Sequence, residues 1–165
     1  MTKIFAHRGA SAYAPENTME AFELAAKQGA DGIELDVHVT KDGEVVVTHD
    51  EKIDRVSNGS GFIKDMTLRE LKRLSFHNHM ESYVGVGIPT LREVLEYVST
   101  TNMDVNIELK TGIYWYPQIE EKTAFIVQET GMHDRVIYSS FNHHSIAKIK
   151  EIDSTAETAW LFSDV

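Results

Sequence analysis

Strand-like and helix-like segments alternate along this chain, and that alternation constrains the fold more than any other feature. The predicted strands are short apolar runs over residues 3–7, 32–40, 44–49, 104–110, 135–141 and 158–162. The predicted helices are amphipathic segments over residues 16–26, 67–74, 90–98, 118–130 and 143–152. The first and fourth helices are expected to end at Gly29 and Gly131. This order is typical of parallel βα units and not of an all-β or all-α domain.

Two places depart from a plain βα repeat. The turn Lys41-Asp42-Gly43 is too short to hold a crossover helix, which leaves the pairing of the third predicted strand open. The stretch of about residues 50–90 is longer than an ordinary loop and is typical of a lid or small subdomain beside a site. We therefore predict one domain over residues 1–165 with an insertion at about 50–90.

The length bears on whether the βα units can close into a barrel. A (β/α)8 barrel typically has about 250 residues, whereas this chain of 165 residues reaches Val165 just after its sixth predicted strand. Two strands of such a barrel would be missing. The sequence then describes a fragment, an open sheet, or a barrel that another copy completes.

The composition fits one soluble globular domain, because 42% of the residues are hydrophobic and 25% are charged. The net charge is -10 and no block of Lys or Arg could neutralise a row of phosphates, so a nucleic-acid partner is disfavoured. The chain has no cysteine. A metal ion would therefore be held by Asp, Glu, His or carbonyl oxygen, which favours a hard cation such as Mg²⁺ or Ca²⁺.

The N-terminal residues turn polar too soon for a secretory signal, and no stretch approaches the ~18 apolar residues of a membrane span. We expect a cytoplasmic protein without stable membrane insertion. An open sheet would expose apolar edges, so a homo-oligomer is a possible state.

Acidic residues alternate with apolar ones in two predicted strands. Side chains two apart share a face of a strand, so Glu34 and Asp36 point the same way, and Glu108 lies on the corresponding face of the later strand together with Asn106 and Lys110. Burying these carboxylates without compensation would cost several kcal/mol each. We expect a divalent cation to compensate them, although ordinary salt bridges with Arg8 or Lys110 are the alternative.

Two histidines and two cations lie near the ends of predicted strands. His7 and His49 each end a strand, and they are predicted to serve as an acid and a base in cleaving a phosphodiester. Arg8 offers a planar fork for two phosphate oxygens, and Lys110 adds a point charge. Taken singly, each has a simpler interpretation, for example a strand-terminal His49 bonded to Asp50.

Aromatic residues follow two of these strands and are candidates for the substrate pocket. Tyr114 and Trp115 come just after Lys110, and Phe141 ends the fifth predicted strand. They could contact the alcohol portion of a substrate. Packing against the insertion, or an ordinary core role for Phe141, is the alternative.

In combination, these motifs resemble the glycerophosphodiester phosphodiesterase family, and the resemblance covers nearly the whole chain. The matching pieces are His7-Arg8-Gly9, Pro15-Glu16-Asn17-Thr18, Glu34-Leu35-Asp36-Val37, Thr40-Lys41-Asp42-Gly43, His49-Asp50, Ile88-Pro89-Thr90-Leu91, Asn106-Ile107-Glu108-Leu109-Lys110 and Ser140-Phe141. Each piece alone is weak, but their combination and order are specific.

The resemblance implies an α/β fold of the TIM (β/α)8 barrel type, here lacking its last two strands and carrying a small insertion after the third. It implies hydrolysis of a small glycerophosphodiester to glycerol 3-phosphate and an alcohol, with Mg²⁺ or Ca²⁺ as cofactor and a neighbouring glycerol hydroxyl displacing the alcohol through a cyclic phosphate. By motif match, Glu34, Asp36 and Glu108 are the metal ligands. His7 and His49 are the general acid and base, and Arg8 and Lys110 bind the phosphate.

Two other functions compete with this one. The chain could be a catalytically inactive metal- or phosphate-binding fragment, which turnover by the purified chain would exclude. It could also be a phospholipase D-like lipid phosphodiesterase, but no strongly amphipathic membrane-binding stretch stands out.

Overall fold

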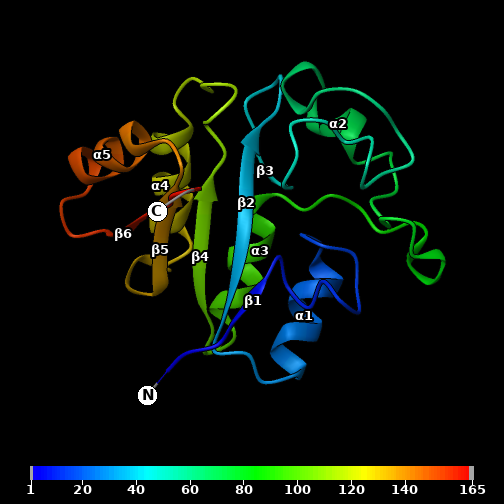
Figure 1. Ribbon diagram of the computed structural model, residues 1–165, viewed down its shortest axis with the longest axis horizontal. Coiled ribbons are helices and arrows are strands. Elements are labelled where there is room, and N and C mark those ends of the chain that lie inside the picture. Colours follow the sequence, from blue (N-terminus) through cyan, green and yellow to red (C-terminus); the bar gives the residue numbers. More distant parts are fainter. Residues whose placement is uncertain (1, 164–165) are drawn as a thin grey trace.

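A computed structural model describes residues 2–163 (Figure 1). The strands are β1 (Phe5–His7), β2 (Gly32–Val39), β3 (Val45–Val47), β4 (Asp104–Leu109), β5 (Val136–Ser140) and β6 (Glu157–Trp160). The α-helices are α1 (Met19–Lys27), α2 (Leu68–Leu71), α3 (Leu91–Ser99), α4 (Ile119–Glu129) and α5 (His143–Ile152). Short 3₁₀ turns cover Ile63–Asp65, Glu81–Tyr83 and His133–Arg135. Every predicted strand and helix is present, with shifted ends.

Five strands run parallel in the order β1-β2-β4-β5-β6. β3 lies outside this path and pairs antiparallel with β2, with Val37 opposite Val47, because the connection between β2 and β3 is too short for a parallel crossover. The prediction of six barrel strands is therefore wrong by one. Compared with an eight-stranded barrel, residues 2–163 lack three parallel strands and not two. β1 and β6 are not paired with each other in this part of the chain, so the barrel is open.

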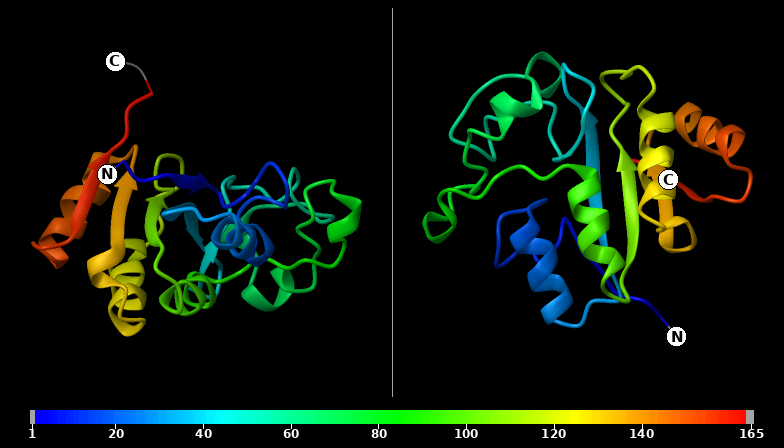
Figure 2. Two further views of the ribbon diagram at one scale, coloured as in Figure 1. Left: turned by 90° about the horizontal axis from the view of Figure 1, so that it is seen from below. Right: turned by 180° about the vertical axis from the view of Figure 1, so that it is seen from behind.

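Helices α1, α3, α4 and α5 pack on one side of the curved sheet (Figure 2). The main core lies between the two layers and is supplied by alternate residues of each strand, for example Ile33, Leu35 and Val37 of β2. The residues between them in β2, Glu34 and Asp36, are directed to the opposite, concave side of the sheet. All eight residues of β2 are buried, so its polar side chains are enclosed as well as its apolar ones.

The helix ends follow the predicted signals. Thr18 caps α1 and accepts a hydrogen bond from the backbone of Ala21. Thr67 and Thr90 form capping boxes at the start of α2 and α3. The α1 and α4 helices end just before Gly29 and Gly131, as predicted. No helix in residues 2–163 has the length and apolar character needed to cross a bilayer.

The segment between β3 and α3 has its own small core. Buried side chains from this segment, together with Val46 of β3, form a cluster separate from the main one; those from the segment are Ile53, Val56, Ile63, Leu71, Phe76 and Ile88. The segment lies beside the carboxyl end of β2 (Figure 1). It is thus an ordered excursion that begins directly after His49.

Candidate active site

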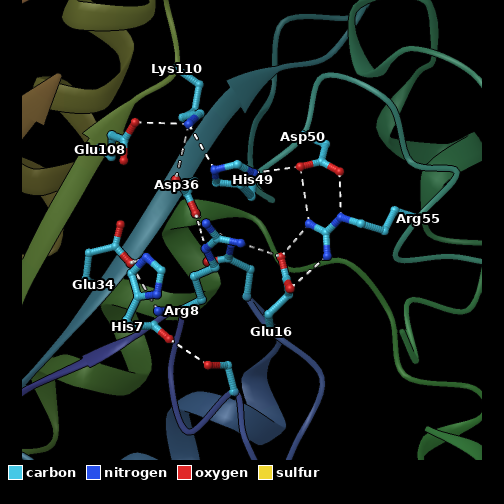
Figure 3. A network of polar contacts seen from close by, with 12 residues as sticks. His7, Arg8, Glu16, Glu34, Asp36, His49, Asp50, Arg55, Glu108 and Lys110 are labelled. Carbon is cyan, nitrogen blue, oxygen red and sulfur yellow. Dashed lines mark hydrogen bonds and ion pairs between the residues drawn. The ribbon is translucent and has the colours of Figure 1, made fainter. Parts of the chain in front are cut away.

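The register of the sheet brings the predicted polar residues to one end of three parallel strands. His7 of β1 lies opposite Glu34 of β2, and Asp36 lies opposite Glu108 of β4. Lys110 follows β4 directly, and His49 comes two residues after β3. In Figure 3 these side chains converge from different strands on the same region.

Three carboxylates form the centre of this region. Ligand oxygens of Glu34, Asp36 and Glu108 lie within 4.8 Å of one another. The Asp36 side chain is only 1% exposed, and its Oδ1 has no hydrogen-bond partner among the described residues. Burial, together with the neighbouring charge of Glu34, raises the pKa of Asp36 to about 6. Burial also raises the pKa of Glu34.

This cluster is compatible with a divalent cation. Two cationic side chains flank it: Lys110 Nζ lies 3.0 Å from Glu108 Oε1 and 3.8 Å from Asp36 Oδ1, and Arg8 Nε lies 3.6 Å from Asp36 Oδ2. They do not satisfy the buried Oδ1 with a hydrogen bond, and burial still keeps the pKa values of Asp36 and Glu34 above their ordinary values. An oxygen-only donor set, with one buried carboxylate oxygen that lacks a hydrogen-bond partner among the described residues, suits a divalent cation.

Arg8 is held at the edge of the cluster by several contacts. Its backbone has a left-handed conformation, with φ of 58°, and its backbone N–H donates to Glu34 Oε2 at 3.0 Å. Its Nη1 donates to Glu16 Oε1 at 3.1 Å. The guanidinium is therefore fixed between Glu16 and Asp36 while its side chain stays 20% exposed.

His49 is bonded on both sides of its ring. The Asp50 carboxylate lies 2.6 Å from Nδ1, and Asp50 has its pKa lowered to about 2, chiefly by hydrogen bonds from Arg55. An ionised carboxylate only accepts, so Nδ1 carries the proton. Nε2 lies 3.3 Å from Lys110 Nζ, which can only donate. Nε2 of neutral His49 is thus an acceptor facing the cluster.

His7 differs from His49 in its surroundings. Its side chain is 70% exposed, and Nε2 lies 3.8 Å from Glu34 Oε2. The ring can therefore reach both the carboxylate cluster and solvent, which is what a group that exchanges protons with water needs.

One cavity joins nearly all of these groups. Its volume is about 380 Å³. It is lined by six of the seven polar residues singled out in the sequence, namely His7, Arg8, Glu34, His49, Glu108 and Lys110, with Asn106, Ser139, Phe141 and Leu161. Asp36, whose side chain is 1% exposed, is not among the residues that line it. An adjoining cavity of about 230 Å³ shares His49, Glu108, Lys110 and Phe141.

The predicted aromatic residues separate into two groups. Phe141 is half exposed and lines both cavities. Tyr114 and Trp115 are not among the described residues that line either one. Tyr114 packs edge-on against Phe62 of the insertion, with ring centroids 5.8 Å apart, and Trp115 stacks on His144. For Tyr114, the structure therefore agrees with the alternative given in the sequence analysis, packing against the insertion.

Other residues of the site were not assigned roles from sequence. Asn17 Nδ2 donates to Asp36 Oδ2 at 2.9 Å, and Arg55 contacts both Glu16 and Asp50. His38 is buried, with Nδ1 2.8 Å from the Tyr116 hydroxyl and Nε2 3.0 Å from the His49 carbonyl oxygen. Asn17 lies in the Pro15-Glu16-Asn17-Thr18 motif, which was noted as one of the pieces that resemble the family but without a role for Asn17. No sequence pattern near Arg55 indicated that it contacts Glu16 and Asp50.

Comparison with known proteins identifies the family. A model of the glycerophosphoryl diester phosphodiesterase family matches residues 7–165. The chain belongs to this family. It is 51% identical over 152 residues to a protein of Caldanaerobacter subterraneus subsp. tengcongensis named glycerophosphodiester phosphodiesterase, covering 92% of this chain and 63% of the relative. A Bacillus altitudinis protein of the same name is 50% identical over 167 residues, covering all of this chain and 68% of that relative.

Solved structures of the family share the fold. A glycerophosphodiester phosphodiesterase of Agrobacterium tumefaciens has a TM-score of 0.87 at 37% identity, covering 96% of this chain and 66% of that one. An Oleispira antarctica phosphodiesterase, in complex with the product sn-glycerol-3-phosphate, has a TM-score of 0.91 at 31% identity. The match covers 97% of this chain and 66% of that one. The open sheet thus has the α/β TIM-barrel type of fold, and the chain spans about two thirds of the length of the glycerophosphodiester phosphodiesterases that it matches.

Proposed function

We propose that this chain is a metal-dependent glycerophosphodiester phosphodiesterase that hydrolyses a small glycerophosphodiester to glycerol 3-phosphate and an alcohol. The observation that carries the proposal is the convergence of two histidines, three carboxylates, Arg8 and Lys110 at one cavity. The names of the similar proteins and the glycerol 3-phosphate in the Oleispira structure support the substrate class.

Glu34, Asp36 and Glu108 would hold the cation, and their oxygen donors favour Mg²⁺ or Ca²⁺. Bound there, the cation supplies positive charge next to a phosphate and compensates the buried carboxylates. Arg8 and Lys110 lie on either side of the cluster. They would bind and orient the phosphate from two directions, Arg8 with a planar fork and Lys110 with a point charge.

The two histidines would share the proton transfers. Cleavage needs one group to take a proton from the attacking oxygen and another to give a proton to the leaving alkoxide. Nε2 of His49 faces the cavity as an acceptor, because Asp50 holds the proton on Nδ1. His7 lies across the cavity with access to solvent. Both rings line the same cavity, so the pair would act on a phosphate bound there.

Product analysis tests this proposal. The chain is incubated with glycerophosphocholine and Mg²⁺ or Ca²⁺, and ³¹P NMR follows the phosphorus-containing product. Glycerol 3-phosphate is expected, whereas phosphocholine would mean that the other ester bond is cleaved. A parallel arm with a lysophospholipid tests the lipid alternative. No turnover in any arm by a folded chain would leave only an inactive binding protein. The cytoplasmic location and a homo-oligomeric state stay predictions from sequence.

A further inference from the structure

We propose that Arg55 is a positioning residue, which fixes His49 and Arg8 in their working orientations through Asp50 and Glu16. The inference rests on the proposed function, because it assigns a role within the same site. Arg55 itself does not line the described cavities beside the carboxylates, so it would act through other residues and not on the substrate.

The Arg55 guanidinium contacts two carboxylates at once (Figure 3). Nε donates to Asp50 Oδ2 at 2.8 Å and Nη2 to Asp50 Oδ1 at 3.2 Å. On the other side, Nη1 donates to Glu16 Oε2 at 2.9 Å and Nη2 to Glu16 Oε1 at 2.8 Å. Both contacts are bidentate, a geometry that a planar guanidinium allows and an ammonium does not.

The same two carboxylates hold the residues of the site. Asp50 Oδ1, which accepts from Arg55, is also the oxygen 2.6 Å from Nδ1 of His49. Glu16 Oε1, which accepts from Arg55, also accepts from Nη1 of Arg8 at 3.1 Å. Each carboxylate is thus fixed on one side by Arg55 and fixes a site residue on the other.

Arg55 lies in the insertion, and its backbone position is set by the small core there. It stands between Ile53 and Val56, which are 0% and 4% exposed and belong to the second cluster. The Ser57 N–H donates to the Ile53 carbonyl at 3.0 Å and closes the turn. The Arg55 side chain is not part of this core: it is 43% exposed and extends to Glu16 and Asp50. Through Arg55 the insertion therefore holds Glu16 and Asp50, the two carboxylates that contact Arg8 and His49.

The charges in this group of four residues balance. Glu16 and Asp50 carry two negative charges, and Arg8 and Arg55 carry two positive ones. Removing Arg55 leaves a net negative charge beside a site that binds an anionic phosphate. It also frees Asp50 to rotate away from His49, so the loss is expected mainly in kcat.

A set of variants tests the role of Arg55 by kinetics. Arg55→Ala is expected to lower kcat by about 10- to 100-fold. Arg55→Lys should lose less activity, because it keeps the positive charge but not the planar guanidinium that contacts each carboxylate twice. In a Glu16→Gln/Asp50→Asn background, Arg55→Ala should change kcat by less than about 3-fold, because its partners are altered. Arg73→Ala, at an exposed arginine of the same insertion, is the matched control and should resemble the unmodified chain. Thermal unfolding of each variant confirms that it folds.

A second measurement does not depend on turnover. In NMR spectra of the unmodified chain, the Nδ1–H proton of His49 should be a slowly exchanging low-field resonance, assigned by its loss in His49→Gln. It should persist in Arg73→Ala and broaden or vanish in Arg55→Ala. If no protein in the series turns over substrate, the proposed function fails while this test of Arg55 still stands. If the resonance persists in Arg55→Ala, or kcat falls equally in both backgrounds, Arg55 is not a positioning residue.

Discussion

Nζ of Lys110 lies 3.3 Å from Nε2 of His49, which joins a residue that follows a barrel strand to one that follows the hairpin strand β3. Only a neutral imidazole can accept this hydrogen bond. A substrate phosphate that draws the ammonium toward itself would release Nε2. In the proposed function, Lys110 would thus link phosphate binding to the availability of the proton acceptor.

Replacing His49 tests its role as acid or base. We expect His49→Gln to lower kcat by about 10²- to 10⁴-fold, the usual contribution of a general acid or base. Its side chain is 31% exposed, so the melting temperature should hardly change. Steady-state kinetics and thermal unfolding measure the two effects. A variant with unchanged kcat would remove His49 from the proposed mechanism.

Asp36 should make the cation-free protein less stable at high pH. Its pKa is about 6 in the folded state against an ordinary 3.8, so the folded state holds the proton longer, and stability falls as the pH rises from about 4 through 6. At pH 8 with chelator, Asp36→Asn should therefore be more stable than the unmodified chain by roughly 1–3 kcal/mol. At pH 4 the difference should disappear.

With added Mg²⁺ or Ca²⁺ at pH 8, the unmodified chain should become more stable than Asp36→Asn, because only the unmodified chain keeps all three carboxylates. Thermal unfolding with chelator and with cation gives both comparisons. An Asp36→Asn variant that is less stable than the unmodified chain in chelator at pH 8 would contradict the electrostatic account of this cluster.

His38 should make the folded state less stable as the pH falls, whereas Asp36 does so as the pH rises. It is 0% exposed, and burial lowers its pKa from 6.5 to about 4. Between these values the unfolded chain takes up a proton and the folded one does not, so stability is lost as the pH falls from about 7 to 4. His38→Gln should therefore show a shallower loss of melting temperature on acidification. The matched control is His79→Gln, at an exposed position. Equal slopes for His38→Gln and the unmodified chain would count against this assignment.

Gly9 should not tolerate a side chain. Its φ is +77°, and a Cβ there would lie 2.7 Å from Ala21 Cβ and 2.8 Å from the Ala21 carbonyl carbon. Gly9→Ala should cost roughly 2–4 kcal/mol of stability through strain and crowding. At Gly112 an added Cβ meets nothing within 4 Å, so Gly112→Ala should change stability by less than about 0.5 kcal/mol. Denaturant unfolding compares the two, and equal losses would be inconsistent with the close packing of Gly9 on α1.

The sequence predicted what depends on local periodicity. Alternation in β2 and β4 was enough to place Glu34, Asp36 and Glu108 on one face, because side chains of a strand alternate by geometry alone. The polarity of residues 41–43 showed that a turn occurs, but the pairing of β3 depends on which strand edge is free. Counting β3 as a barrel strand was therefore wrong.

Contacts between distant segments were beyond local patterns. Arg55 is 39 residues from Glu16, and nothing near it in sequence marks its partners. The burial of His38 depends on Tyr116, which is 78 residues away. Tyr114 follows Lys110 closely, yet it packs on Phe62 of the insertion. Such placements are set by tertiary packing and not by spacing.

The most direct test of the central claim is the rate of glycerol 3-phosphate release from glycerophosphocholine in chelator and after Mg²⁺ or Ca²⁺ is restored. It is measured for the unmodified chain, for Glu34→Ala, and for Glu129→Ala at an exposed position of α4. We predict cation-dependent release by the unmodified chain and by Glu129→Ala, and almost none by Glu34→Ala. Release that persists in chelator, or that survives Glu34→Ala, would contradict a catalytic cation held by these carboxylates.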